Sequence, residues 1–163
     1  MIMRIVAVIL LAGLLASCGF HLRGQQKFPF DSVAISPPSS SLALALKRAI
    51  REGSEAQVVD NPTKTSYRLE ILSEMDDRII LSLDATGQVR EYQLRYKVVF
   101  RLLDAKGNLR LPRSKLLLTR LLSYDISEIL AKESEAALLN RDMQNDAVDQ
   151  ILRRLAAVKP DEN

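Results

Sequence analysis

The chain contains a single thiol, at Cys18, and this thiol follows directly on a short apolar segment. Residues 5–15 form an almost unbroken apolar run, and Ala16 and Ser17 are small. A membrane-spanning helix needs about 20 apolar residues, so this run is too short, and no later run approaches that length. An apolar run that ends in small residues is typical of a secretory signal peptide. We therefore expect removal of residues 1–17 and export of the rest.

The stretch Leu15-Ala16-Ser17-Cys18 resembles the lipobox of bacterial lipoproteins. The resemblance implies that a signal peptidase recognises Leu15, Ala16 and Ser17, that the Cys18 thiol is alkylated with diacylglycerol, and that cleavage and acylation of the new amine follow. Three fatty chains would hold the protein on a membrane, because each buried CH₂ contributes about 0.8 kcal/mol. Gly19 stands where an aspartate often marks inner-membrane retention, which favours the outer membrane. The alternative is an ordinary signal peptide with an incidental cysteine.

The composition limits which partners the protein can bind and which interactions can stabilise it. Lysine and arginine number 23 against 20 aspartates and glutamates, which gives a formal net charge of +3. This balance is too weak to indicate nucleic-acid binding, and export argues against it as well. With Cys18 acylated, no disulfide can form within the chain, so packing must supply the stability. Apart from this covalent lipid we expect no cofactor.

Residues that commonly carry catalysis are scarce. The single histidine, His21, lies close to the predicted anchor, so the body of the protein has no histidine-based triad. No Cys/His cluster has metal-ligand spacing. Glu70, Glu74, Asp76 and Asp77 are possible acid–base groups of an anchored hydrolase, but neighbouring acids on a strand more often form a solvated edge. We therefore expect no catalytic residues, no metal site and no enzymatic activity.

Several basic residues fall on one face of the clearest predicted strand. Arg95, Lys97 and Arg101 alternate with apolar residues, and Lys132 lies where the strands give way to the last helix. Further cations lie on or near the same sheet: Arg68, Arg78 and Arg90. Two interpretations stay open. This face is either an ordinary solvated surface or a surface that meets an anionic partner such as lipid phosphates.

The first half of the exported chain predicts a tether, a strand and a helix. Residues 18–30 show no clear period and are expected to form a lipidated tether. A short strand is expected over residues 31–35. Apolar residues then recur at helical spacing from Leu42 to Ile50, after possible caps at Ser39–Ser41, and Gly53 is placed to end the helix. Residues 57–59 are a further strand candidate.

The middle of the chain changes to the two-residue period of strands. Alternation begins at Tyr67, with a break expected around Asp76-Asp77, and is clearest over residues 91–102. A hairpin turn is expected at residues 104–108. Pro112 should interrupt the returning strand, which we expect to restart near Ser114 and, because its leucines make both faces apolar, to be covered on both faces over part of its length. Three long strands joined by tight turns predict an antiparallel meander.

The end of the chain is helical in pattern. Apolar residues recur every three to four positions from Leu138 to Leu155, and the start is expected between Ser127 and Ser134. Two amphipathic helices must cover their apolar stripes, and the apolar face of the sheet is available. The predicted fold is therefore α+β, with two helices on one face of a mostly antiparallel sheet. Residues 31–158 form this single domain, and residues 159–163 form a flexible tail.

Three stretches of the chain resemble the LptE family of lipopolysaccharide-assembly lipoproteins. They are the opening Cys18-Gly19-Phe20-His21-Leu22-Arg23-Gly24, then Glu91-Tyr92-Gln93 after the Thr86-Gly87-Gln88 turn, and Leu130-Ala131-Lys132-Glu133. The expected order of helix, meander and long helix also agrees with that family, so the resemblance covers nearly the whole exported chain.

The resemblance implies an outer-membrane lipoprotein that faces the periplasm. It would bind inside the LptD β-barrel as plug and assembly partner and help to place lipopolysaccharide in the outer leaflet. Family members are also thought to bind lipopolysaccharide through two basic positions. Lys132 matches one, whereas the turn at residues 84–87 has no cation and Arg90 is a nearby substitute; Arg95 is a further candidate contact. The alternative is a lipid-anchored periplasmic carrier that holds an apolar ligand between sheet and helices.

Overall fold

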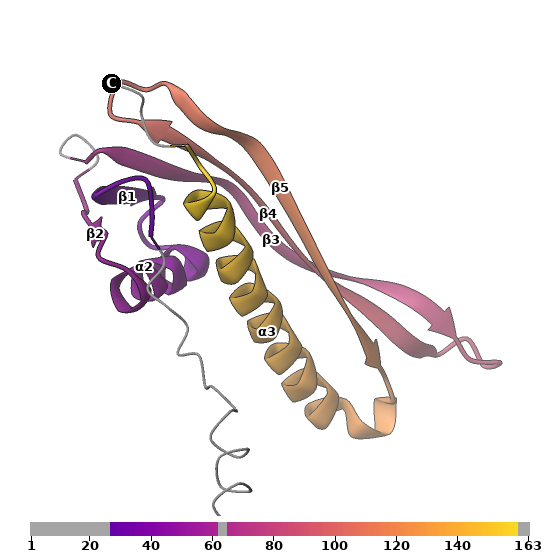
Figure 1. Ribbon diagram of the computed structural model, residues 1–163. Helices are drawn as coiled ribbons and strands as arrows, with labels where there is room; N and C mark the ends of the chain where they lie inside the picture. Colours follow the sequence, from indigo (N-terminus) through magenta and orange to yellow (C-terminus); the bar gives the residue numbers. More distant parts are fainter. Residues whose placement is uncertain (1–26, 62–64, 160–163) are drawn as a thin grey trace, which may run out of the picture.

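The computed structural model describes residues 27–61 and 65–159 (Figure 1). The elements in chain order are β1 (Ser32–Ser36), α2 (Ser41–Gly53), β2 (Gln57–Val58), β3 (Tyr67–Leu83), β4 (Val89–Asp104), β5 (Leu109–Ser123), the 3₁₀ turn η2 (Ile126–Glu128) and α3 (Ile129–Ala156). The predicted leader, Cys18 and the signal residues Leu15, Ala16 and Ser17 lie outside the described residues. In the described part, no helix is both long and apolar enough to cross a membrane.

The strands form one mixed sheet in the order β2-β1-β3-β4-β5. β1 runs parallel to β2 and β3, and the three long strands β3, β4 and β5 are antiparallel neighbours. The β4–β5 turn lies at the end of the sheet that carries β1, which we call the near end. The β3–β4 turn lies at the opposite, far end (Figure 1). The fold is therefore α+β with a mostly antiparallel sheet, as predicted.

Both helices cover the same face of the sheet, which we call the inner face (Figure 1). The alternation in β4 explains this arrangement, because its even-numbered apolar residues are buried: Leu94, Tyr96, Val98, Phe100 and Leu102. α3 adds Met143, Ile151 and Leu155 to this core, all without exposed surface. The helix α2 begins where the Ser40 hydroxyl accepts a hydrogen bond from the Ala43 N–H at 3.1 Å.

β3 is one continuous strand, so the predicted break at Asp76-Asp77 is wrong. The strand keeps its pairing with β4 through this stretch, where Asp76 lies opposite Tyr96 and Asp77 opposite Arg95. Asp77 faces the uncovered outer face of the sheet and pairs with cations there, so its charge does not oppose strand formation. The register with β4 shifts instead at Leu72 and again over residues 80–83.

β5 corrects two further predictions. Pro112 lies within the strand, which is possible because β5 is an edge strand and a missing N–H on its free side costs no ladder bond. The register with β4 shifts at this point. The leucines of β5 are covered on one face only: Leu117 and Leu121 are 63% and 65% exposed on the outer face.

Two aromatic residues of the segment before β1 pack onto the body. Phe28 and Phe30 stack with ring centroids 5.1 Å apart, and the Phe30 ring lies 5.2 Å from that of Tyr67. Phe30 is buried in the core. The chain is therefore fixed to the near end of the sheet from Phe28 onward.

Candidate functional site

A cleft at the far end of the sheet contains two of the predicted lipopolysaccharide contacts, Arg90 and Lys132. It lies between the β3–β4 hairpin and the start of α3 and has a volume of about 670 Å³. Its lining comes from β3, β4, the end of β5 and the segment that leads into α3: Ser82, Leu83, Arg90, Glu91, Ser123, Tyr124, Asp125, Glu128 and Lys132. We call it the far-end cleft.

Lys132 is positioned by the turn between β5 and α3. Asp125 caps the 3₁₀ turn η2, because its carboxylate accepts hydrogen bonds from the N–H and hydroxyl of Ser127. α3 follows at once and places Lys132 back against the strand. There its ammonium group donates to the Ser123 hydroxyl at 3.2 Å and pairs with Glu135 at 3.0 Å. The Lys132 side chain is only 15% exposed, so its charge is held in place.

Arg90 is positioned by the tight turn before β4. The Asp84 carboxylate accepts hydrogen bonds from Thr86 and from the Gln88 N–H, and Gly87 takes a positive φ of 82°. These hydrogen bonds, together with nearby Arg90, keep the pKa of Asp84 below its ordinary value. The Arg90 carbonyl accepts from the Tyr124 N–H at 2.7 Å, which joins the hairpin to the far side of the cleft.

The charges of the far-end cleft have both signs. Glu91, Asp125 and Glu128 line it together with Arg90 and Lys132. Hydrogen bonds from Ser127, with a smaller contribution from Lys132, lower the pKa of Asp125, so this carboxylate stays ionised. Apolar residues around the cleft are exposed: Leu83, Ile126, Ile129 and Leu130. This arrangement fits an amphiphile with both charged and apolar parts better than a bare phosphate.

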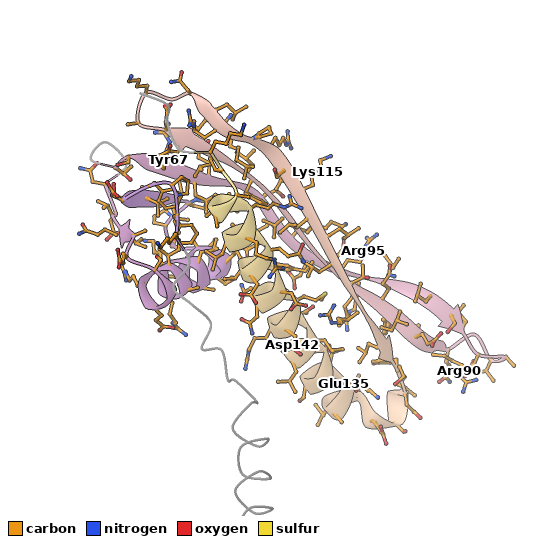
Figure 2. All side chains as sticks on the ribbon, viewed as in Figure 1. Tyr67, Arg90, Arg95, Lys115, Glu135 and Asp142 are labelled. Carbon is orange, nitrogen blue, oxygen red and sulfur yellow. The ribbon has the colours of Figure 1, made fainter. Side chains whose placement is uncertain are left out.

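Arg95 does not belong to this cleft. It pairs with Asp77 on the outer face and is not among the residues that line the cleft, whereas Arg90 lines it. Figure 2 shows Arg90 at the tip of the hairpin and Arg95 well back along the strands. The Arg95 guanidinium pairs with Asp77 at 2.5 Å, and Lys97 pairs with the same carboxylate at 2.6 Å. These bonds lower the pKa of Asp77 to about 2.

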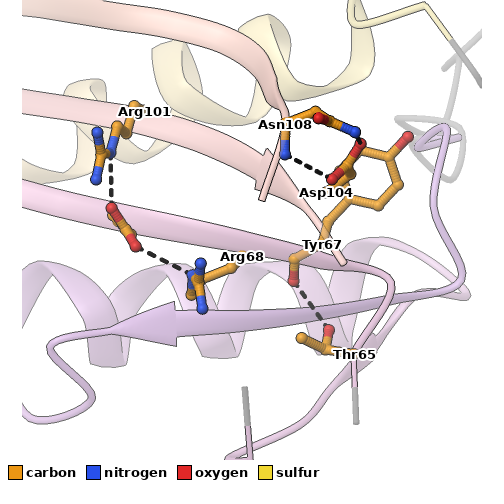
Figure 3. A network of polar contacts seen from close by, with 7 residues as sticks. Thr65, Tyr67, Arg68, Arg101, Asp104 and Asn108 are labelled. Carbon is orange, nitrogen blue, oxygen red and sulfur yellow. Dashed lines mark hydrogen bonds and ion pairs between the residues drawn. The ribbon is translucent and has the colours of Figure 1, made fainter. Parts of the chain in front are cut away.

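The four candidate acid–base carboxylates do not converge on one site. Glu70 bridges Arg101 at 2.7 Å and Arg68 at 3.0 Å on the outer face (Figure 3). Glu74 accepts hydrogen bonds from the Tyr96 and Ser41 hydroxyls on the inner face. Asp76 and Asp77 face opposite sides of β3, and Asp77 is engaged by cations. The geometry gives no support to a hydrolase.

Sequence reasoning missed a polar and aromatic cluster on the inner face beside the cleft. Arg78 donates to Glu133 of α3 at 2.8 Å, and its guanidinium lies over the Tyr92 ring at 5.4 Å. Tyr92 in turn meets Tyr124 edge to face, at 5.1 Å. The sequence could not reveal this cluster, because the pairing register between β3 and β4 brings Arg78 and Tyr92 together.

Comparison with known proteins identifies the family. The family model described as "LptE: Lipopolysaccharide-assembly" matches residues 30–155. This chain belongs to the LptE family. The lipopolysaccharide-assembly lipoprotein LptE of Pectobacterium atrosepticum is 29% identical over 88% of the chain and 79% of its own length. LptE of Yersinia enterocolitica is 30% identical over 88% of the chain and 70% of its own length.

Solved structures agree with the LptE fold. The solution structure of an uncharacterized lipoprotein B from Nitrosomonas europaea is 39% identical, with a TM-score of 0.74 over 85% of this chain and 91% of that one. The rare lipoprotein B of Shewanella oneidensis is 28% identical, with a TM-score of 0.66 over 77% and 92%. Membership confirms the predicted lipoprotein class and lipopolysaccharide-assembly role. Because LptE relatives are named for assembly, it also confirms that the protein is not an enzyme.

Proposed function

We propose that this LptE-family lipoprotein is anchored through Cys18 to the outer membrane and binds an LptD-type β-barrel as its plug and assembly partner. In this role it helps to place lipopolysaccharide in the outer leaflet. The family match supports the assembly role, and the lipobox-like stretch supports the anchor. Gly19 after the cysteine supports the outer membrane as destination.

The proposed binding to a barrel is supported by the difference between the two faces of the sheet, of which one is covered by helices and the other is open and charged. The lumen of a transmembrane barrel is polar, so a protein that fills it needs a self-contained core and a polar surface. Here both helices cover one face of the sheet and bury the core, while the outer face presents the ion pairs of Asp77 and Glu70. The Asp77 and Glu70 carboxylates are thus paired within the sheet, and a face with such ion pairs can lie against a wet wall.

The far-end cleft is the proposed contact for lipopolysaccharide. Arg90 and Lys132 line it together, and exposed apolar residues surround it. Arg95 is not part of this contact, because Asp77 already engages its guanidinium in two hydrogen bonds.

No observation favours the alternative function, a periplasmic carrier of an apolar ligand. The space between sheet and helices is filled by side chains of the core, among them Phe100, Met143 and Ile151, which have no exposed surface. A ligand of the carrier type would have to displace them.

Affinity purification of the tagged, lipidated protein from mild-detergent extracts of its native outer membranes tests the proposal. We expect a stable complex with a large outer-membrane β-barrel. Cys18→Ala should abolish lipid labelling and leave the precursor unprocessed. Recovery of the parent protein as a monomer without a barrel would overturn the proposed function, and lipid labelling that persists in Cys18→Ala would overturn the anchor.

A further inference from the structure

A pocket lies at the near end of the sheet, between the last turn of α3 and the start of β5. Figure 1 shows the end of α3 close to the β4–β5 turn. The pocket has a volume of about 430 Å³, and the described residues that line it include three cations, Arg110, Arg154 and Lys159, and no acid. We call it the near-end pocket. Because the far-end cleft mixes both signs of charge, the near-end pocket is the one that attracts an anion.

Arg154 is the lining residue whose hydrogen-bond donors are unused. Its guanidinium lies over the ring of Phe100, 5.8 Å from the ring centre, and Phe100 has no exposed surface. This contact holds the guanidinium by its face and leaves the N–H donors at its edge. Within residues 27–61 and 65–159, no group accepts a hydrogen bond from the Arg154 guanidinium and no carboxylate pairs with it. Arg154 can therefore donate several hydrogen bonds to a bound anion.

The neighbouring Arg153 shows how much the end of the helix explains by itself. Both arginines lie in the last turn of α3, where cations suit the negative end of the helix dipole. Arg153, however, is exposed and does not line the pocket. The helix dipole thus accounts for a cation at either position, whereas only Arg154 is held against the core at the pocket.

Hydrogen bonds fix the rim of the near-end pocket. The Arg110 guanidinium donates to the Lys159 carbonyl at 3.0 Å, which joins the end of α3 to β5. Asp104, the last residue of β4, does not line the pocket. Its carboxylate accepts hydrogen bonds from the N–H groups of Lys106 and Asn108 and from the Asn108 side chain (Figure 3). This carboxylate is held within its own turn, and the cations of the pocket outnumber it.

The near end is also the end that stays close to the proposed lipid anchor. Phe28 packs there beside Phe30, which contacts Tyr67. Cys18 precedes Phe28 by ten residues, which span no more than about 36 Å when fully extended. The far end lies the length of β4 away, about 50 Å for its 16 residues. A leaflet that holds fatty chains on Cys18 therefore stays within a tether's length of the near end, and lipid phosphates cover its surface.

We propose that the near-end pocket binds the phosphate of an anionic phospholipid in the leaflet that holds the anchor. Arg154 donates to the phosphate oxygens, and Arg110 and Lys159 add positive charge. Leu109, which is 55% exposed and also lines the pocket, contacts the apolar part of the lipid. Inorganic phosphate offers the same oxygens but has no apolar part. This inference goes beyond the proposed function and takes from it only the anchor at Cys18.

The first experiment measures phospholipid binding by native mass spectrometry of the full-length lipidated protein. The protein is equilibrated in detergent micelles that contain phosphatidylglycerol or phosphatidylcholine with the same acyl chains, and we expect tighter binding of phosphatidylglycerol. Arg154→Gln should weaken this binding about tenfold, which corresponds to 1.4 kcal/mol. The matched control Arg153→Gln should bind as the parent does. Lys159→Gln, which changes an exposed side chain, should weaken binding about threefold.

Three results of this experiment would overturn the proposal. Equal losses in Arg154→Gln and Arg153→Gln would reduce the effect to general attraction by charge. Equal binding of the two phospholipids would show that the pocket does not recognise an anionic headgroup. Displacement of the lipid by equimolar inorganic phosphate would assign the site to the free anion. The melting temperatures of all variants should match the parent, and Lys159→Gln keeps the test valid if Arg154→Gln alone is less stable.

Asp161 and Glu162 are tested separately as competitors for the pocket. They follow Lys159 closely in the sequence and lie outside the described residues. The double variant Asp161→Asn with Glu162→Gln should raise the affinity for phosphatidylglycerol by no more than about threefold, because it removes nearby negative charge. A larger rise would identify the end of the chain as the occupant of the pocket and overturn the proposal.

The second experiment locates the lipid in native outer membranes. A photoreactive residue at position 157, which lines the pocket, should form a phospholipid adduct in greater yield than one at position 138, which is exposed elsewhere on α3. Equal yields would overturn the proposal. Lipid labelling of Cys18 in the same membranes reports on the anchor. Absence of labelling would overturn the anchor of the proposed function, whereas labelled protein that binds no phospholipid in micelles would overturn the pocket proposal alone.

Discussion

The two parts of β3 show how one strand serves both the fold and its surface. In the near part, residues 67–71, the strand lies between β1 and β4, and Tyr67, Leu69 and Ile71 are buried. In the far part, residues 72–83, it pairs with β4 alone, and most of its large apolar side chains are exposed. The near part therefore anchors the core, whereas the far part presents surface that the isolated chain does not need for folding.

The sharpest test of this difference compares two truncations. Phe100 pairs with Ile71 in the near part and has no exposed surface. Phe100→Ala should lower the free energy of unfolding by about 3–5 kcal/mol, because it leaves a cavity in the core. Leu81→Ala, in the far part, should change it by no more than about 0.5 kcal/mol. Urea denaturation of the isolated protein measures both, and similar losses at the two positions would contradict the division of β3.

The second prediction separates binding from stability at the far end. Lys132→Gln removes the charge from the far-end cleft and keeps most of the side chain's length. We expect lipopolysaccharide binding to weaken about tenfold, which corresponds to 1.4 kcal/mol. Lys115→Gln is the control, because Lys115 is exposed on the outer face of β5, away from the cleft (Figure 2). Equal binding by both variants and the parent would assign Lys132 to a purely structural role beside Ser123 and Glu135.

The fold was largely predictable where the pattern of apolar residues is local. Alternation in β4 predicts its buried residues, and the helical spacing predicts α2 and α3, including the start of α3 at Ile129. The errors arose where a neighbouring strand, or its absence, decides whether a residue can lie within a strand. Cations on β4 make Asp77 compatible with a continuous β3, and the edge position of β5 makes Pro112 tolerable. Neither fact is visible within the segment itself.

The candidate site was predictable only in part. Arg90 and Lys132 were named from the family resemblance, but their shared cleft depends on the turn after β5 and on the register of the hairpin. The alternation within β4 does not separate Arg95 from Arg90, because the register with β3 shifts at Arg90 and Glu91 lines the cleft beside it. The Arg78–Glu133 pair joins residues 55 positions apart, which no local pattern reveals.

The third prediction concerns the near end. Ser40 caps α2, whose buried residues pack on the near part of the sheet. Ser40→Ala leaves the Ala43 N–H without this acceptor and should cost about 1 kcal/mol of the free energy of unfolding. Ser127→Ala at the far end is the comparison, because Ser127 lies in an exposed turn. A larger loss at Ser127 than at Ser40 would place more of the stability at the far end than the burial of the two regions indicates.

The smallest effect is expected for the Asp77 ion pairs, and pH reveals it. Arg95 and Lys97 lower the pKa of Asp77 from 3.8 to about 2 in the folded protein. A carboxyl whose pKa is lower when folded adds stability above its unfolded pKa, and this contribution disappears as pH falls through the folded pKa. The parent should therefore be more stable than Asp77→Asn at pH 5, and the difference should shrink between about pH 4 and pH 2. Asp76→Asn, where no ion pair is lost, should show no comparable convergence in urea midpoints. A difference between parent and Asp77→Asn that stays constant down to pH 2 would mean that the ion pairs on the outer face do not contribute to folding.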